Sequence, residues 1–135
     1  MIPRRIPMIE KRTHTLINEA FCGTVVELTP SASIVELVTT EDMAVDDHGL
    51  IHGGFIFSLA DHAAMVAINH PNVVLGAANV KFLHPVKAGD RIVANARVVK
   101  VDGKKHVVTV DVQRDDEIVF SGEFTCFIPV MHVLT

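Results

Sequence analysis

The stretch from Gly54 to Ile68 constrains the fold of this 135-residue chain more than any other feature. Nearly all of its side chains are apolar or small, and its only ionisable groups are Asp61 and His62. A helix that is apolar on every side has to be wrapped by other structure. An unpaired carboxylate inside it would be costly, unless its pKa rose until the group was neutral. We therefore expect a buried central helix in which Asp61 is either paired for structure or kept for chemistry.

The sequence also marks both ends of this helix. His52, Gly53 and Gly54 open it, and Pro71 ends it because proline has no N–H to donate and disfavours helical angles at the preceding residue. The apolar run is shorter than the roughly 20 residues that a membrane span requires, and it carries two ionisable groups at its middle. We therefore expect a helix of the protein core and not a membrane segment.

Six runs with strand character accompany the helix. Apolar and polar residues alternate most clearly in residues 91–99 and 106–113, which predicts strands with one buried and one wet face. Asp102-Gly103 is a strong hairpin signal, and a second turn is expected at residues 29–32. The expected strands span residues 24–28, 34–39, 73–83, 90–101, 105–114 and 117–127.

Together these elements predict one α+β domain over residues 1–135, in which a curved antiparallel β-sheet wraps around one long central helix. Residues 1–22 are expected to form an N-terminal extension with a short helix from about Thr13 to Ala20. The start of the chain has no secretory-signal pattern, so we expect a cytoplasmic location. Cys22 and Cys126 should then remain reduced.

Charge and histidine content bear on the classes of partner. The formal net charge of −4 and the scarcity of aromatic residues argue against nucleic-acid binding. The eight histidines raise the question of a metal site. His48 and His52 are four residues apart, but Gly49 lies between them in an expected loop, so they do not share a helix face. We expect no metal, no nucleic acid and no membrane partner.

The glycines at the helix start suggest a site for a partly negative oxygen. The free N–H groups of the first turn point outward at the positive end of the helix dipole, and Gly53 and Gly54 let a ligand approach them. Donors of this kind stabilise the oxyanion formed when a carbonyl is attacked, by about 3 to 4 kcal/mol each. Asp61 lies about 12 Å further along the axis, which favours two copies packed with antiparallel helices. The simpler alternative is that the glycines serve close packing, and that Asp61 caps a loop or pairs with His62 or a lysine across an interface.

Two segments of the chain resemble the PaaI-type hot-dog thioesterases. The first is His52-Gly53-Gly54 followed by Leu59-Ala60-Asp61, and the second runs from Asn79 to Pro85 with Gly89-Asp90 after it. The resemblance covers about residues 44–127. It implies a hot-dog fold, dimers or pairs of dimers with a site shared between subunits, and hydrolysis of a small, medium-chain or aromatic acyl-CoA. Coenzyme A is then part of the substrate, and no further cofactor is implied.

The resemblance also implies roles for individual residues. Asp61 would be the general base or nucleophile, Gly53 the donor to the thioester carbonyl, and His52 the residue that shapes or orients the site. Contacts with the substrate are expected from Gly54, Asp46, Asn79 and Phe82. One position departs from the family pattern, because Asp46 stands where many relatives carry Asn. The region of Leu75 and Gly76 is also apolar where some relatives carry a hydroxyl.

Two other functions stay open. Residues 89–127 also resemble the acyl-CoA-sensing domain of the bacterial lipid regulator FapR, which would bind acyl-CoA without hydrolysing it. An acyl-thioester dehydratase of the same fold is the third possibility, but it requires a different arrangement of His and acid in the helix region.

Overall fold

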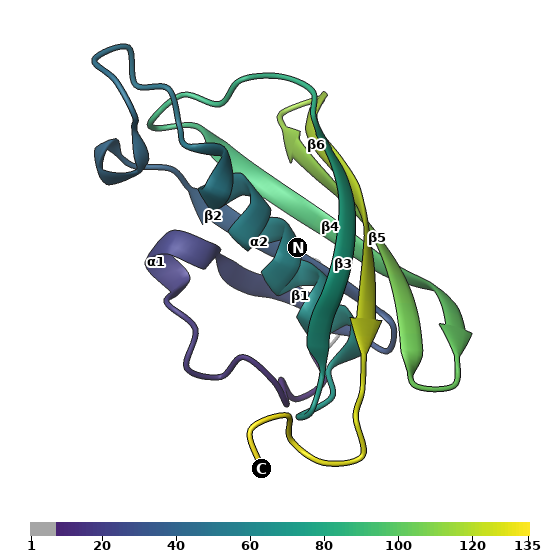
Figure 1. The fold of residues 1–135 in the computed structure, drawn as a ribbon. Coiled ribbons are helices and arrows are strands. Elements are labelled where there is room, and N and C mark those ends of the chain that lie inside the picture. Colours follow the sequence, from purple (N-terminus) through teal and green to yellow (C-terminus); the bar gives the residue numbers. More distant parts are fainter. Residues whose placement is uncertain (1–7) are drawn as a thin grey trace, which may run out of the picture.

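The structure, a computed structural model, describes residues 8–135. One antiparallel six-stranded sheet curves around the long helix α2, Gly53–Ile68 (Figure 1). The strand order in the sheet is β1-β2-β4-β5-β6-β3. This architecture confirms the expected curved sheet around a central helix. The remaining elements are α1 (Glu19–Cys22), β1 (Thr24–Thr29), β2 (Ala32–Val38), the 3-10 turn η1 (Glu41–Met43), β3 (Val74–Phe82), β4 (Arg91–Asp102), β5 (Lys105–Arg114) and β6 (Glu117–Phe127).

The strands follow the alternation of the sequence. In β5, Val108, Val110 and Val112 are buried while the residues between them are exposed, so one face of the sheet meets α2 and the other is open. β5 and β6 have the expected bounds, and the other strands differ from expectation by one or two residues at one or both ends. No helix among the described residues is long and apolar enough to cross a membrane.

The α2 helix is capped by a side chain at its start and by the backbone of Asn69 at its end. At the start, His52 Nδ1 accepts a hydrogen bond from the Gly54 N–H at 2.7 Å. At the end, Asn69 adopts a left-handed conformation with φ of 57°. Its side chain accepts from the Arg12 N–H and donates to the Glu10 carbonyl, both at 2.7 Å. The second cap therefore ties the N-terminal segment to the helix.

The short N-terminal helix forms at Glu19–Cys22 and not at the expected Thr13–Ala20. Asn18 caps it, because its side chain accepts a hydrogen bond from the Ala20 N–H. His14 lies in the left-handed region with φ of 54°, which a continuous helix does not allow. Residues 8–18 therefore run as an irregular segment that packs along α2.

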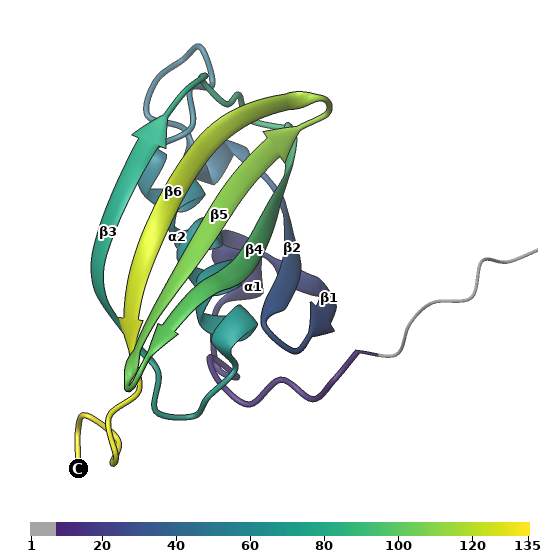
Figure 2. The same cartoon turned by 90° about the vertical axis from the view of Figure 1, so that its right-hand side faces the viewer.

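Strand β3 lies at one edge of the sheet and pairs only with β6 in the part of the chain that the structure describes (Figure 2). The pairing is interrupted by a bulge between Leu75 and Ala77. A Cβ on Gly76, inside this bulge, would clash with the Phe127 ring, so any other residue there would have to displace that ring. The other side of β3 presents backbone N–H and C=O groups to which another strand can bind.

Candidate active site

Asp61 is a largely buried carboxyl on the middle of α2. Its Oδ1 atom is buried and has no hydrogen-bond partner in residues 8–135. Burial raises the pKa of this group from its ordinary value of 3.8 to about 6. Over the same residues, no Lys, Arg or His nitrogen lies within 4.0 Å of its oxygens. Within residues 8–135, Asp61 therefore pairs with neither His62 nor a lysine of its own chain, and a partner across an interface stays a prediction.

His62 makes its contacts away from Asp61 and belongs to the structural core. Its ring is fully buried, with Nδ1 3.0 Å from the Cys22 carbonyl and Nε2 2.9 Å from Lys11 Nζ. Since a carbonyl only accepts, Nδ1 carries the proton and Nε2 accepts from the Lys11 ammonium. Burial, with smaller contributions from Lys11 and His14, lowers the pKa of His62 to about 4, although the bond to Cys22 opposes the shift. The imidazole is thus neutral near pH 7 and holds the N-terminal segment against α2.

The start of α2 offers one free backbone donor. The Gly54 N–H is occupied by His52 Nδ1, and the Phe55 N–H donates to the His52 carbonyl. Within the described residues nothing accepts a hydrogen bond from the Gly53 N–H. The Phe82 ring covers this position, because a Cβ on Gly53 would lie 3.1 Å from its Cε1 atom. The Gly53 amide is therefore available to an oxygen, with an aromatic ring beside it.

A shallow hollow adjoins this amide. It has a volume of about 300 Å³ and is lined by residues of the segments 50–56 and 82–86. Arg114 braces the second segment from β5, since its guanidinium donates to the Pro85 carbonyl at 2.6 Å and to Asp90 at 3.2 Å. Binding pockets for small molecules usually enclose about 300 to 1,000 Å³. The volume of this hollow is thus at the lower bound of that range.

The structure does not bring all the expected site residues together. Asp46 is exposed, and its Oδ1 accepts from the N–H groups of His48 and Leu50, so it shapes the loop before α2. An Asn side chain at this position can accept the same two bonds through its own Oδ1. Asn79 pairs with Glu123 on the face of the sheet turned away from α2. His52, Gly53, Gly54 and Phe82 do lie together, whereas Asp61 is about 12 Å further along the helix.

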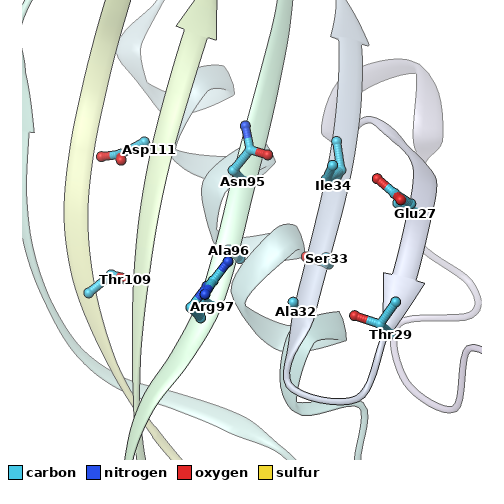
Figure 3. A pocket seen from close by; sticks show the side chains of 10 residues that line it. All are labelled: Glu27, Thr29, Ala32, Ser33, Ile34, Asn95, Ala96, Arg97, Thr109 and Asp111. Carbon is cyan, nitrogen blue, oxygen red and sulfur yellow. The ribbon is translucent and has the colours of Figure 1, made fainter.

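A second hollow, of about 360 Å³, lies on the outer face of the sheet (Figure 3). Figure 3 shows polar side chains of β1, β4 and β5 around it, including Glu27, Arg97 and Asp111. This hollow contains no residue of the motif around Gly53 and Asp61, and the sheet separates it from α2. Among the described residues, no three His, Cys, Asp or Glu side chains are arranged to hold a metal ion, and both cysteines are free.

Sequence reasoning missed three features of this region. The contact of Lys11 with His62 joins residues 51 positions apart, so no local pattern indicates it. The bracing by Arg114 and the cover of Phe82 over Gly53 also depend on long-range packing. For the contact of Lys11 with His62, the sequence offered one signal. A histidine in an apolar, buried helix requires polar partners from elsewhere in the chain.

Comparison with known proteins decides the family. The profile of the thioesterase superfamily matches residues 48–121, which is more than half of the chain. The chain belongs to this superfamily. Within it, the chain has the hot-dog fold and resembles the PaaI type, as its sequence motifs predict.

Two solved structures place this thioesterase-superfamily chain among its relatives. An uncharacterized protein of Pyrococcus horikoshii is 45% identical, with a TM-score of 0.94 over 96% of this chain and 100% of that one. The PaaI protein of the E. coli phenylacetic acid degradation operon is 26% identical, with a TM-score of 0.74 over 81% of this chain and 85% of that one. The thioesterase-superfamily fold therefore extends over most of the described residues.

Two curated relatives of this superfamily member carry other names. A methylthioribose-1-phosphate isomerase of Aquifex aeolicus is 53% identical over 113 residues, which are 84% of this chain but 25% of that protein. The transcription factor FapR of Caldanaerobacter subterraneus is 31% identical over 84% of this chain and 58% of that protein. The chain spans about a quarter and just over half of these relatives, so their names describe longer proteins.

Proposed function

We propose that the chain is an acyl-CoA thioesterase whose site is shared between two protomers. The observation that carries the proposal is Asp61, a carboxyl with a buried, unpartnered oxygen and a pKa raised to about 6, on the same helix as a free Gly53 N–H. Such a carboxyl is ionised at neutral pH and has no internal partner to compete with its chemistry.

In the proposed reaction, the Asp61 carboxylate either removes a proton from water or attacks the thioester carbonyl itself. The carbonyl oxygen becomes an oxyanion and accepts a hydrogen bond from the Gly53 N–H. The carbon–sulfur bond then breaks, and coenzyme A leaves as a thiolate that takes up a proton. In the first route the acid is released directly, and in the second a water molecule hydrolyses the anhydride formed with Asp61. Each route consumes one water and needs no cofactor.

The sharing of the site follows from the length of the helix. Asp61 and Gly53 of one chain are about 12 Å apart along α2, which is too far for both to act on one carbonyl. Two protomers joined through the free edges of β3 bring their helices side by side and antiparallel. Gly53 of one protomer then faces Asp61 of the other, and a symmetric dimer has two such sites.

Aromatic rings line the inner face of the sheet between these two positions. Phe82 contacts Phe120 with ring centroids 5.1 Å apart, and Phe120 continues through Phe124 to Phe57. Phe57 lies one turn before Asp61 on α2. Phe120 and Phe124 are fully buried, whereas Phe82 is 53% exposed, so Phe82 offers the apolar surface and the buried rings support it. An apolar surface of this kind suits a small, medium-chain or aromatic acyl group.

The first test is release of free thiol from a panel of short, medium-chain, long and aromatic acyl-CoA esters. We expect turnover by the wild-type protein and a loss of at least about a hundredfold in Asp61→Asn. Asp111→Asn, on the outer face of the sheet, is the matched control and should keep full activity. Equal turnover by wild type and Asp61→Asn would contradict the assigned role of Asp61.

A mixing experiment tests the shared site. Asp61→Asn and Gly53→Pro each disable one half, so each variant alone should be inactive. In a mixture, half of the dimers are hybrids, and each hybrid has one site with both halves intact. We therefore expect recovery of about a quarter of the wild-type activity. No recovery from hybrids that demonstrably form would contradict sharing between protomers.

Acyl-CoA sensing is the second candidate, and the similarity to FapR favours it. A sensor binds the ester without cleaving it, so calorimetry would show saturable binding of an intact acyl-CoA that Asp61→Asn barely changes. Binding without thiol release from any ester would replace the thioesterase proposal with this one.

A further inference from the structure

The C-terminal tail, residues 129–135, is apolar and uncovered. Val130 and Leu134 are 78% and 87% exposed, and Met131 and Val133 are also exposed. The backbone is nevertheless held in place. The Asn72 side chain lies within hydrogen-bond distance of the Pro129 and Val130 carbonyls, and a turn around His132 closes the last residues. Exposed apolar side chains on a fixed backbone indicate a surface that another molecule covers.

The tail leaves the sheet at the edge strand. Phe127, the last residue of β6, pairs with Val74, the first residue of β3. Figure 2 shows the tail below β3 and on the side of its free edge. Figure 1 shows it turning toward the side of the sheet that carries the helices. The apolar residues of the tail therefore lie next to the position that a second protomer would occupy if it paired with the free edge of β3.

Antiparallel pairing fixes which part of the partner is nearest. Two β3 strands that pair about their middle place Val74 of one protomer beside Phe82 of the other. In the partner, Phe82 is followed by the segment 83–86, which lines the hollow next to Gly53. Phe82 and Leu83 are 53% and 45% exposed, so this hollow also presents uncovered apolar surface.

We propose that the C-terminal tail of one protomer covers the hollow beside Gly53 of its partner. Val130, Met131 and Leu134 then contact the partner's segment 82–86 and complete the wall of a site that one chain leaves open. Because this wall is apolar, it meets an apolar part of the ligand and not its phosphates. The inference rests on the dimer of the proposed function and adds a substrate-contacting segment to it.

Intermolecular paramagnetic broadening tests the contact directly. A spin label on Val133→Cys is introduced in a Cys22→Ser background, since Cys126 is buried and the pKa of its thiol is raised to about 12. Labelled protein at natural isotope abundance is mixed with ¹⁵N-enriched, unlabelled protein. In an equimolar mixture half of the ¹⁵N protomers have a labelled partner, so we expect the amide signals of residues 82–84 and 86 to lose up to about half of their intensity. A label on Leu16→Cys, which is 98% exposed in the N-terminal segment, is the control and should leave these signals unchanged.

Sedimentation and thiol release on the same samples separate the possible failures. A dimer that hydrolyses thioesters without broadening at residues 82–86 would overturn the tail contact and leave the thioesterase proposal intact. A monomer would overturn the tail contact and the shared site together. A dimer with broadening at 82–86 supports the tail contact whether or not it hydrolyses an ester.

A charge in the tail gives a second, independent measurement. Leu134→Asp should weaken the dimer by about tenfold in Kd and raise the KM of the best acyl-CoA, because the carboxylate would be buried against apolar residues. Leu16, which is 98% exposed in one chain, is the control position, and Leu16→Asp should change neither quantity. Equal effects of the two substitutions, or none from Leu134→Asp, would contradict the proposed contact.

Discussion

His52 Nδ1 accepts a hydrogen bond from the Gly54 N–H at 2.7 Å, and this single contact determines which amide of the helix start is free. Without it, the Gly53 and Gly54 amides would be equivalent candidates for an oxyanion donor. With it, Gly54 serves the cap and Gly53 remains available. A Cβ on Gly54 would lie 2.7 Å from His52 Nδ1, so the cap itself requires glycine at this position.

Two substitutions of Gly53 should distinguish the role of its N–H donor from the role of its missing side chain. Proline is favoured at the first position of a helix and lacks the N–H, and the His52 backbone at φ −59° and ψ 129° suits a residue before proline. Gly53→Pro should therefore fold and lose about a hundredfold to a thousandfold in kcat. Gly53→Ala adds the same Cβ but keeps the donor, so it should retain most of kcat. Similar losses in both variants, measured by thiol release with circular dichroism as the folding control, would show that crowding against Phe82 is the cause.

The activity of the wild-type protein should depend on the protonation of Asp61. The reacting form is the carboxylate, and burial raises the pKa of the group to about 6. The value of kcat should therefore rise about tenfold per pH unit below 6 and level off above it. Stopped-flow thiol release between pH 4.5 and 8 gives the profile. A plateau that extends to about pH 4.5 would mean that the carboxyl keeps its ordinary pKa.

Asp61→Asn should stabilise the fold at neutral pH. The folded protein raises the pKa of Asp61 from 3.8 to about 6, so it favours the protonated carboxyl and the ionised form costs stability. This cost is complete above pH 6 and disappears as the pH falls toward 4. Asn resembles the neutral carboxyl, so the variant should gain on the order of 2 to 3 kcal/mol in the free energy of unfolding at pH 7 and almost nothing near pH 4. Urea unfolding at both pH values, with Asp111→Asn as control, tests this dependence.

His62 makes the stability of the fold depend on pH in the opposite direction to Asp61. Its pKa falls to about 4 on folding, from an ordinary value of 6.5, so protons bind preferentially to the unfolded chain between these values. Stability from the neutral imidazole is present above pH 6.5 and is lost as the pH falls toward 4. In the wild type the contributions of Asp61 and His62 nearly cancel between pH 4 and 6. The Asp61→Asn variant should therefore lose stability on acidification over this range more steeply than the wild type does.

Two substitutions of Asn69 should separate backbone conformation from hydrogen bonding. Asn69→Gly keeps the left-handed conformation but removes the bonds to Arg12 and Glu10, which should cost about 1 to 3 kcal/mol. Asn69→Ala removes the same bonds and adds about 1 kcal/mol of backbone strain. Hydrogen exchange should show faster exchange of the Arg12 amide in both variants, and thermal unfolding should rank alanine below glycine. Unchanged exchange at Arg12 would mean that the Lys11–His62 contact alone holds the segment.

The fold was largely predictable because its main signals are local. The apolar run before Pro71 and the alternation in β4 and β5 depend on neighbouring residues, and these elements lie where they were expected. The N-terminal segment was less predictable, since its backbone is shaped by distant contacts. The bond between Lys11 and His62, for example, joins it to α2.

The site was predictable only in part. His52, Gly53 and Asp61 are expected at the site from their resemblance to the PaaI-type motif, and the structure adds that the His52 side chain occupies the Gly54 N–H and leaves that of Gly53 free. Asn79 was expected near the substrate, but its position in β3 places it on the outer face of the sheet. A shift of one residue in a strand moves a side chain to the opposite face, so sequence alone assigns such positions poorly.

The uninterrupted helix α2 also limits how this protein can change during evolution. Asp61 stands eight positions after Gly53, and an α-helix turns by about 100° per residue. Inserting or deleting one residue between them would rotate the carboxylate out of the position it now occupies and displace the apolar rows beyond it. Substitutions within this interval can adjust the wall of the site, but its length is fixed by the geometry of the helix.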